Sequence, residues 1–226
     1  MSSTEAGKLF VVATPIGNLG DITLRALETL KSVSLILAED TRVTKRLLAK
    51  YTITTPTLSC HEHTEKKKLE GIITRLVAGE SMAVVTDAGT PGLSDPGNFL
   101  VSLALEARVS VVPIPGVSAL GALVSVAGID LREFVFLGFP PHKKGRETFF
   151  RSVAESKLPV MYYESPHRIV KNLELLQQFA PMKRIILGRE LTKMFEEVLR
   201  GNIPSVLATL TSDAKKLKGE FVIIVY

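Results

Sequence analysis

The sequence has a single cysteine and no long hydrophobic run, and these two features exclude some classes of protein. Because Cys60 is alone among 226 residues, no internal disulfide can form, which is typical of proteins in a reducing cytoplasm. The longest apolar stretches have the length of strands and are quickly interrupted, so no transmembrane helix is expected. Residues 1–8 are polar and lack the apolar core of a secretory signal. We therefore expect a cytoplasmic protein that does not contact a membrane.

Several catalytic signatures are also missing. There is no G-x-G-x-x-G, which argues against a dinucleotide fingerprint, and Ser94 lacks the G-x-S-x-G elbow of many hydrolases. The run Cys60-His61-Glu62-His63 contains residue types that bind zinc, but only two further histidines and no second Cys/His pair accompany it. We therefore expect a turn or a substrate-contacting loop at this run, and no metal site.

Positive charge is present in excess, with a net charge of +5, and much of it is clustered. The clusters are Arg42, Lys45 and Arg46; Lys66, Lys67 and Lys68; Lys143, Lys144 and Arg146; and Lys215, Lys216 and Lys218. Any one cluster is explained by a solvated helix face, whereas four along one chain favour a surface that contacts phosphates. The composition thus favours a polyanionic partner.

The first half of the chain alternates strands and helices, as a doubly wound α/β domain does. We expect strands at 9–13, 35–38, 82–86 and 109–112, and helices that begin at Asp21, at Asp40 or Thr41, at Thr64 and at Pro96. The helix residues predicted to face inward are Leu24, Leu27 and Leu30; Val43, Leu47, Leu48 and Tyr51; and Leu69, Ile72, Ile73, Leu76 and Val77 before a stop at Gly79. Because the strands are continuous apolar runs, a mainly parallel sheet is predicted.

A Pro/Gly hinge at 113–116 predicts a boundary between a first domain, 1–115, and a second, 116–226. For the second domain we expect strands at 134–138, 160–163, 184–188 and 220–226, helices at 118–127, 146–155, 167–179 and 204–210, and a charged segment at 189–201. The predicted fold class is α/β, with two domains, mainly parallel sheets and a cofactor cleft between them.

The loop at 87–97 is the most informative segment. It follows a buried strand, begins with the acidic Asp87, and contains three glycines that let the backbone approach a ligand. Asp95 and Pro96 are predicted as the N-cap and first residue of the next helix. Loops at the carboxyl ends of such strands bind small molecules in open α/β sheets. We therefore interpret 87–97 as a cofactor loop.

Two more turns of small residues, at 14–20 and 113–119, also follow strands of the first domain. Backbone N–H and C=O groups from all three turns can bind an adenine edge, ribose hydroxyls and an amino-acid carboxylate. The alternative is three ordinary turns between strands and helices.

Charged residues mark the ends of other strands, at 39–42, 163–168 and 189–197. The first two share one arrangement, in which a carboxylate ends a strand and an arginine begins a helix. The alternative to a functional role is an ion pair across the domain boundary.

Taken together, these motifs resemble the tetrapyrrole methylase superfamily, and among its members most closely those that methylate small-subunit ribosomal RNA. The resemblance runs from residue 9 to residue 226. It is carried by ATPIGNLGDIT at 13–23, AEDTR at 38–42, SCHEHT at 59–64, DAGTPGLSDPG at 87–97, PIPGVSA at 113–119, YESPHR at 163–168, LGRELTKMFEE at 187–197 and GEFVIIV at 219–225. Such relatives usually continue with a small helical extension, whereas this sequence ends at Tyr226.

The resemblance implies S-adenosyl-L-methionine as methyl donor, bound between the two domains of a homodimer. It implies transfer to the ribose 2′-hydroxyl of a cytidine in the decoding region of small-subunit rRNA, free or in the assembled small ribosomal subunit. The implied cofactor contacts are Pro15, Gly17, Asp87, Ala88, Gly89, Thr90, Ser118, Ala119, Tyr163 and Gly219. Our candidates for a base that deprotonates the hydroxyl are Glu39, Asp40, Glu164 and Glu190. The candidates for binding RNA phosphates are Arg42, Arg168 and Lys193.

Three other functions remain open at this point. The same donor can serve a methylase of a corrin or porphyrin precursor, although the basic clusters favour RNA. A donor-binding module that attaches to the ribosome without catalysis is the second alternative. A metal hydrolase built on Cys60, His61 and His63 is the third.

Overall fold

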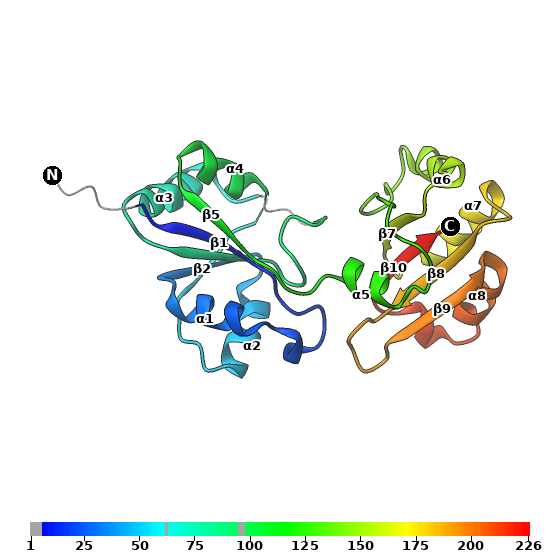
Figure 1. Cartoon of the computed structure of the whole chain (residues 1–226), viewed down its shortest axis with the longest axis horizontal. Coiled ribbons are helices and arrows are strands. Elements are labelled where there is room, and N and C mark those ends of the chain that lie inside the picture. Colours follow the sequence, from blue (N-terminus) through cyan, green and yellow to red (C-terminus); the bar gives the residue numbers. More distant parts are fainter. Residues whose placement is uncertain (1–5, 62, 95–97) are drawn as a thin grey trace. The chain divides into compact units, whose positions relative to one another are not determined.

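The computed structural model describes residues 6–61, 63–94 and 98–226. The chain divides into two compact units, Met1–Ser118 and Ala119–Tyr226, and in each a sheet is covered by helices (Figure 1). The predicted cap Asp95 and first helical residue Pro96 lie outside the described residues.

The first unit is built on a five-stranded sheet, ordered β3-β2-β4-β1-β5, in which every strand pair is parallel. Its strands are β1 (Lys8–Val12), β2 (Leu35–Ala38), β3 (Thr57–Ser59), β4 (Met82–Val85) and β5 (Ser110–Ile114). Its helices are α1 (Leu24–Ser32), preceded by the 3-10 turn η1 (Leu19–Asp21), α2 (Thr41–Lys50), α3 (Lys66–Val77) and α4 (Asn98–Glu106). Parallel strands need such crossovers, because each must start from the same edge of the sheet. The predicted parallel α/β pattern is confirmed here.

The central strands contribute side chains to two hydrophobic cores, one on each face of the sheet. Ile36 and Ala83, paired in register across β2 and β4, lie in the core beneath α1 and α2. Their neighbours Leu37 and Val84 point the other way, into the core beneath α3 and α4. Figure 1 shows these helix pairs on opposite faces. Strands buried on both faces explain why they read as continuous apolar runs.

The start of α1 differs from the prediction, because Thr23 and not Asp21 is its N-cap. The Thr23 hydroxyl accepts a hydrogen bond from the Ala26 N–H at 3.1 Å, whereas Asp21 ends η1. The buried face is therefore formed by Ala26 and Leu30, while Leu24 is 79% exposed. Both residue types cap helices well, so the sequence alone did not decide between positions two residues apart.

The ends of α2 and α3 are closer to expectation. Asp40 is the N-cap of α2, and its carboxylate accepts the Arg42 N–H at 2.8 Å. Gly79 follows α3 with a left-handed φ of 104°, as a stop glycine should. Two of the predicted inward residues, Val43 and Val77, are instead exposed at the margins of their helices.

The second unit has a five-stranded sheet of its own, ordered β6-β7-β10-β8-β9. Its strands are β6 (Val135–Phe136), β7 (Val160–Glu164), β8 (Arg184–Arg189), β9 (Glu197–Asn202) and β10 (Phe221–Val225). Its helices are α5 (Ala119–Val126), α6 (Arg146–Glu155), α7 (Ile169–Phe179) and α8 (Ile203–Thr211), with the 3-10 turn η2 (Ala214–Leu217) before β10.

The expectation of mainly parallel sheets is wrong for this unit, although the α/β class is confirmed. Only β6 and β7 pair in parallel, whereas β10 runs antiparallel to β7 and β8, and β9 runs antiparallel to β8. The segment 189–201, expected only as charged, contains all of β9 except Asn202, and β9 forms a hairpin with β8. Strands joined by a short loop must run antiparallel. There is no clear signal for β9 in the sequence, because its exposed residues are Arg200 and Asn202 and its apolar residues are few.

The core of the second unit lies under α6, α7 and α8, where Phe150, Leu173 and Ile203 pack against Tyr162 and Ile223 of the sheet. On the other face, α5 comes so close that a Cβ added to Gly188 would lie 3.0 Å from the Cδ1 atom of Leu123. The lack of a side chain at Gly188 therefore lets α5 pack closely against the sheet. None of the described helices of the chain is long and apolar enough to cross a membrane.

Candidate functional site

The loops after β1 and β4 are joined at the carboxyl edge of the first sheet. Thr14 and Gly89 form an antiparallel bridge, in which the Thr14 N–H donates at 2.9 Å and the Gly89 N–H at 3.0 Å. The Thr14 hydroxyl also donates to the Thr86 carbonyl at 3.0 Å. Gly89 has a φ of 83°, a conformation that glycine adopts without strain. Two of the three predicted turns therefore meet.

The turn after β5 contacts the same place. The Thr90 hydroxyl donates to the Val117 carbonyl at 3.1 Å, which connects the third turn to the 87–94 loop. A Cβ added to Gly116 would lie 2.9 Å from the Cβ of Ala13, so glycine is needed for the turn to pass beside β1. All three predicted turns thus converge at one edge of the sheet.

These turns leave backbone groups available to a ligand. Across the residues that the structure describes, the N–H groups of Ala88, Gly116 and Val117 make no hydrogen bond. Ala88 and Gly116 are also exposed. Unpaired donors at the carboxyl edge of a parallel sheet suit the oxygen and nitrogen acceptors of a carboxylate, a ribose or an adenine. The site fits a small polar molecule that is bound mainly through main-chain atoms.

Three carboxylates lie at the beginning of the 87–94 loop. The Asp87 Oδ1 atom accepts the Asp40 N–H at 3.1 Å, and the Asp87 N–H donates to the Glu39 Oε2 atom at 3.3 Å. The guanidinium of Arg42 binds both carboxylate oxygens of Asp40, at 2.6 and 3.1 Å, and lowers the pKa of Asp40 to about 2. Burial raises the pKa of Asp87, and the charge of Asp40 adds to the rise.

This arrangement predicts that Asp87→Asn stabilises the ligand-free protein at neutral pH. A carboxyl with a raised pKa in the folded state destabilises the fold once it is ionised, and asparagine removes that charge while keeping an oxygen for the Asp40 N–H. The gain should be present at pH 7 and vanish below the unfolded-state pKa of about 3.9, where both proteins are neutral at this position. Thermal unfolding from pH 3 to pH 8 measures it, and equal stability of the two proteins at pH 7 would contradict it.

In the second unit, Glu164 and Arg168 belong to one buried network. The Glu164 carboxylate accepts hydrogen bonds from the Ser165 N–H at 2.7 Å and from the Asn172 amide at 2.5 Å, and it lies 3.4 Å from Arg168 Nε. Arg168 also donates to the Pro140 carbonyl at 2.9 Å. These contacts hold the turn between β7 and α7 and explain why the predicted carboxylate and arginine occur together.

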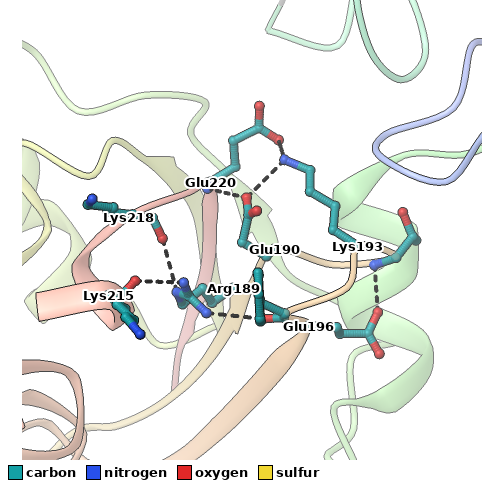
Figure 2. Close-up of polar contacts among 9 residues, drawn as sticks. Arg189, Glu190, Lys193, Glu196, Lys215, Lys218 and Glu220 are labelled. Atoms are coloured by element: carbon teal, nitrogen blue, oxygen red, sulfur yellow. Dashed lines mark hydrogen bonds and ion pairs between the residues drawn. The ribbon is translucent and has the colours of Figure 1, made fainter. Parts of the chain in front are cut away.

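A second network surrounds Glu190, at the end of β8 (Figure 2). Its Oε1 atom accepts hydrogen bonds from the Lys193 ammonium at 2.9 Å and from the Glu220 N–H at 3.0 Å. Lys193 also binds the Glu220 carboxylate at 3.0 Å. Burial alone would raise the pKa of Glu190, but the bonds from Lys193 and Glu220 outweigh it and lower the pKa. A Cβ at Gly219 would lie 2.5 Å from this carboxyl group.

The residues implied as cofactor contacts fall into two groups. In the turns of the first unit lie Pro15, Gly17, Asp87, Ala88, Gly89, Thr90 and Ser118. In the second unit, Ala119 begins α5, Tyr163 lies in β7 beside the rings of Phe136 and Phe139, and Gly219 precedes β10. The sequence-based prediction missed Thr14, Val117 and Asn172, whose roles depend on partners far along the chain and left no local signal.

The Cys60–His63 run lies beyond β3. Cys60 is buried, and burial raises the pKa of its thiol. The rings of His61 and His63 meet edge to face at 6.2 Å. Among the described residues, no group of three or more His, Cys, Asp or Glu side chains is placed to hold a metal ion.

A family model described as Tetrapyrrole (Corrin/Porphyrin) Methylases matches residues 8–207 of the sequence. The chain belongs to the tetrapyrrole methylase family. Among solved structures of this fold, a cobalt precorrin-4 methyltransferase superposes with a TM-score of 0.70 at 16% identity, covering 96% of this chain and 94% of that one. A uroporphyrin-III-C-methyltransferase from Thermus thermophilus gives 0.67 at 18% identity, covering 97% and 94%.

Proteins that are more similar to this chain in sequence carry the name Ribosomal RNA small subunit methyltransferase I. The Ribosomal RNA small subunit methyltransferase I of Xylella fastidiosa (strain Temecula1) is 47% identical over 221 residues, which are 97% of this chain and 81% of that protein. The protein of the same name from Leptospira biflexa is 44% identical over 223 residues, covering 97% of this chain and 91% of its own length.

Proposed function

We propose that this chain transfers a methyl group from S-adenosyl-L-methionine to small-subunit rRNA, at the ribose 2′-hydroxyl of a cytidine in the decoding region. The observation that carries the proposal is the identity of 42–47%, over nearly the full chain, to relatives that all bear the name Ribosomal RNA small subunit methyltransferase I. We further propose a cytoplasmic homodimer as the active form, as the resemblance of the sequence motifs implies.

The geometry of the first unit supports the choice of donor. The three converging turns offer the N–H groups of Ala88, Gly116 and Val117, and the carboxylate of Asp87, at one edge of the sheet. These donors and this acceptor match the carboxylate, ribose and adenine of a nucleoside bearing an amino acid. When bound, S-adenosylmethionine supplies an electrophilic methyl group on its sulfonium.

The contacts of the carboxylates favour alignment over proton abstraction as the main contribution of the protein. Asp40 has a pKa of about 2 and is therefore a weak base. Glu190 has a lowered pKa and is bound by Lys193, and Glu164 is buried among its own donors. We propose that these three carboxylates organise the loops, that Glu39 remains the candidate base, and that in-line alignment of the reacting atoms supplies most of the rate.

The test is labelled methyl transfer to small ribosomal subunits from a strain that lacks the endogenous activity, followed by nucleoside mapping. Label in a 2′-O-methylcytidine supports the proposal. Free rRNA and a carboxylated tetrapyrrole serve as alternative acceptors in parallel reactions. Label in the tetrapyrrole alone, or donor binding without transfer to any acceptor, would contradict the proposal.

Arg42 provides a prediction about RNA. Its side chain is 87% exposed beside the donor-site turns, so Arg42→Ala should weaken RNA binding several-fold, as expected for one phosphate contact, and leave the donor affinity unchanged. Arg132→Ala is the matched control, because Arg132 makes the same bidentate pair with Asp130 and is 89% exposed. Calorimetry with donor and with RNA separates the two affinities. Equal losses of both affinities in Arg42→Ala would assign Arg42 to the fold or the donor site.

A further inference from the structure

The loop of the β8–β9 hairpin, residues 190–196, presents two large apolar side chains to solvent. Met194 is 91% exposed and Phe195 is 68% exposed. The loop itself is well defined, because the Thr192 N–H donates to the Glu196 carboxylate at 2.5 Å and the buried Leu191 anchors its beginning. Exposure of Phe195 is therefore a property of an ordered turn.

Arg189 ties this loop to a second segment of the chain. Its side chain donates to the carbonyl of Phe195 at 3.0 Å, of Lys215 at 2.8 Å and of Lys218 at 3.0 Å (Figure 2). Arg189 is only 7% exposed, so the cost of burying its charge is offset by these carbonyls. Because three carbonyls converge on one guanidinium, the backbone of Phe195 lies next to that of both lysines.

The lysines near the loop differ in what they bind. Lys193 is held by Glu190 and Glu220, and Lys216 is paired with Glu197 at 2.7 Å. Lys215 and Lys218 are exposed, and within the part of the chain that the structure describes neither makes an ion pair. The positive charge available to a partner on this surface thus comes from Lys215 and Lys218, rather than from the predicted Lys193.

We propose that Met194, Phe195, Lys215 and Lys218 form a surface that binds unpaired nucleotides of the RNA substrate. The ring of Phe195 stacks on a base, Met194 extends the apolar contact, and the two ammonium groups bind neighbouring phosphates. The inference rests on the proposed function, which makes RNA the substrate. Aromatic rings flanked by cations are how proteins bind single-stranded nucleic acid without reading base edges.

The composition of the surface favours RNA over a protein partner. Lysine is depleted from the cores of protein interfaces, and two apolar side chains cover far less area than a stable protein contact requires. A base offers a flat apolar face of the size of one aromatic ring. The phosphates of the RNA backbone supply the negatively charged partners that Lys215 and Lys218 lack within the described part of the chain.

The test measures binding of a labelled single-stranded RNA oligonucleotide and of the same sequence as a duplex, by fluorescence anisotropy at several salt concentrations. Phe195→Ala should weaken single-strand binding roughly tenfold, and Phe195→Trp should restore it, since stacking needs a π face. The double variant Lys215→Ala/Lys218→Ala should reduce the slope of log affinity against log salt by about 1.4. Phe195→Ala should keep its thermal midpoint, because the side chain packs little.

Two variants outside the surface serve as controls, Met182→Ala for an exposed apolar side chain and Lys157→Ala for an exposed charge. Both should bind as the wild type does. Unchanged binding by Phe195→Ala, or an equal loss on the duplex, would overturn the proposal. Binding of the same variants to assembled small subunits is measured in parallel, and a loss seen only there would point to a ribosomal protein and overturn the proposal too. If the wild type methylates subunits and Phe195→Ala does so with unchanged KM, the surface is wrong while the proposed function stands.

Discussion

Gly89→Val should reduce the affinity for S-adenosylmethionine roughly 100-fold, which corresponds to about 2.7 kcal/mol. The left-handed φ of 83° disfavours a β-branched residue, and a Cβ there already lies 3.5 Å from the Cγ2 atom of Ile16. Adding two methyl groups should push the loop away from Thr14 and break the bridge that aligns the turns. Calorimetric titration with the donor measures the effect.

The control for Gly89→Val is Gly128→Val in the second unit. Gly128 also has a left-handed φ, of 72°, but an added Cβ there meets no atom within 4 Å. Both variants therefore carry similar backbone strain, about 1–3 kcal/mol, and only Gly89→Val should lose donor affinity. Donor binding at wild-type strength by Gly89→Val would show that the converging turns are not the donor site.

Glu164→Ala should destabilise the second unit by about 3–5 kcal/mol, because it leaves the charge of Arg168, whose side chain is only 15% exposed, without its counterion. The variant leaves the amide of Asn172, a residue that is 1% exposed, without its hydrogen-bond acceptor. It also removes the ion pair between Arg168 and residue 164 at the turn after β7. The side chain of Glu164 is fully buried in the wild type, so water does not readily take the place of the lost carboxylate. Denaturant unfolding monitored by circular dichroism measures the loss.

Glu174→Ala removes the same group from an exposed position of α7 and should change stability by less than about 0.5 kcal/mol. Glu164→Gln, which keeps an oxygen acceptor but not the charge, should fall between the two. If Glu164→Ala proves as stable as Glu174→Ala, the network does not organise the turn, and Glu164 returns as a candidate base.

Much of the fold follows from local sequence signals. The first sheet is parallel because its strands are apolar throughout and are separated by segments long enough for crossover helices. Caps and stop glycines such as Asp40 and Gly79 were predictable, because they act on residues within one helical turn. Thr23 was missed because Asp21 competes with it locally. β3 was missed because three residues carry too little periodic pattern.

The candidate site divides in the same way. The sequence by itself determined the three glycine-containing turns, the charged strand ends and the family, because each is recognised from short stretches of contiguous residues. Only the tertiary structure decided that Thr14 pairs with Gly89, that Lys193 is occupied by Glu190 and Glu220, and that Arg189 gathers the Phe195 and Lys218 carbonyls. The physical reason is that hydrogen bonds and ion pairs depend on distances in space, and folding sets those distances between residues that are far apart along the chain.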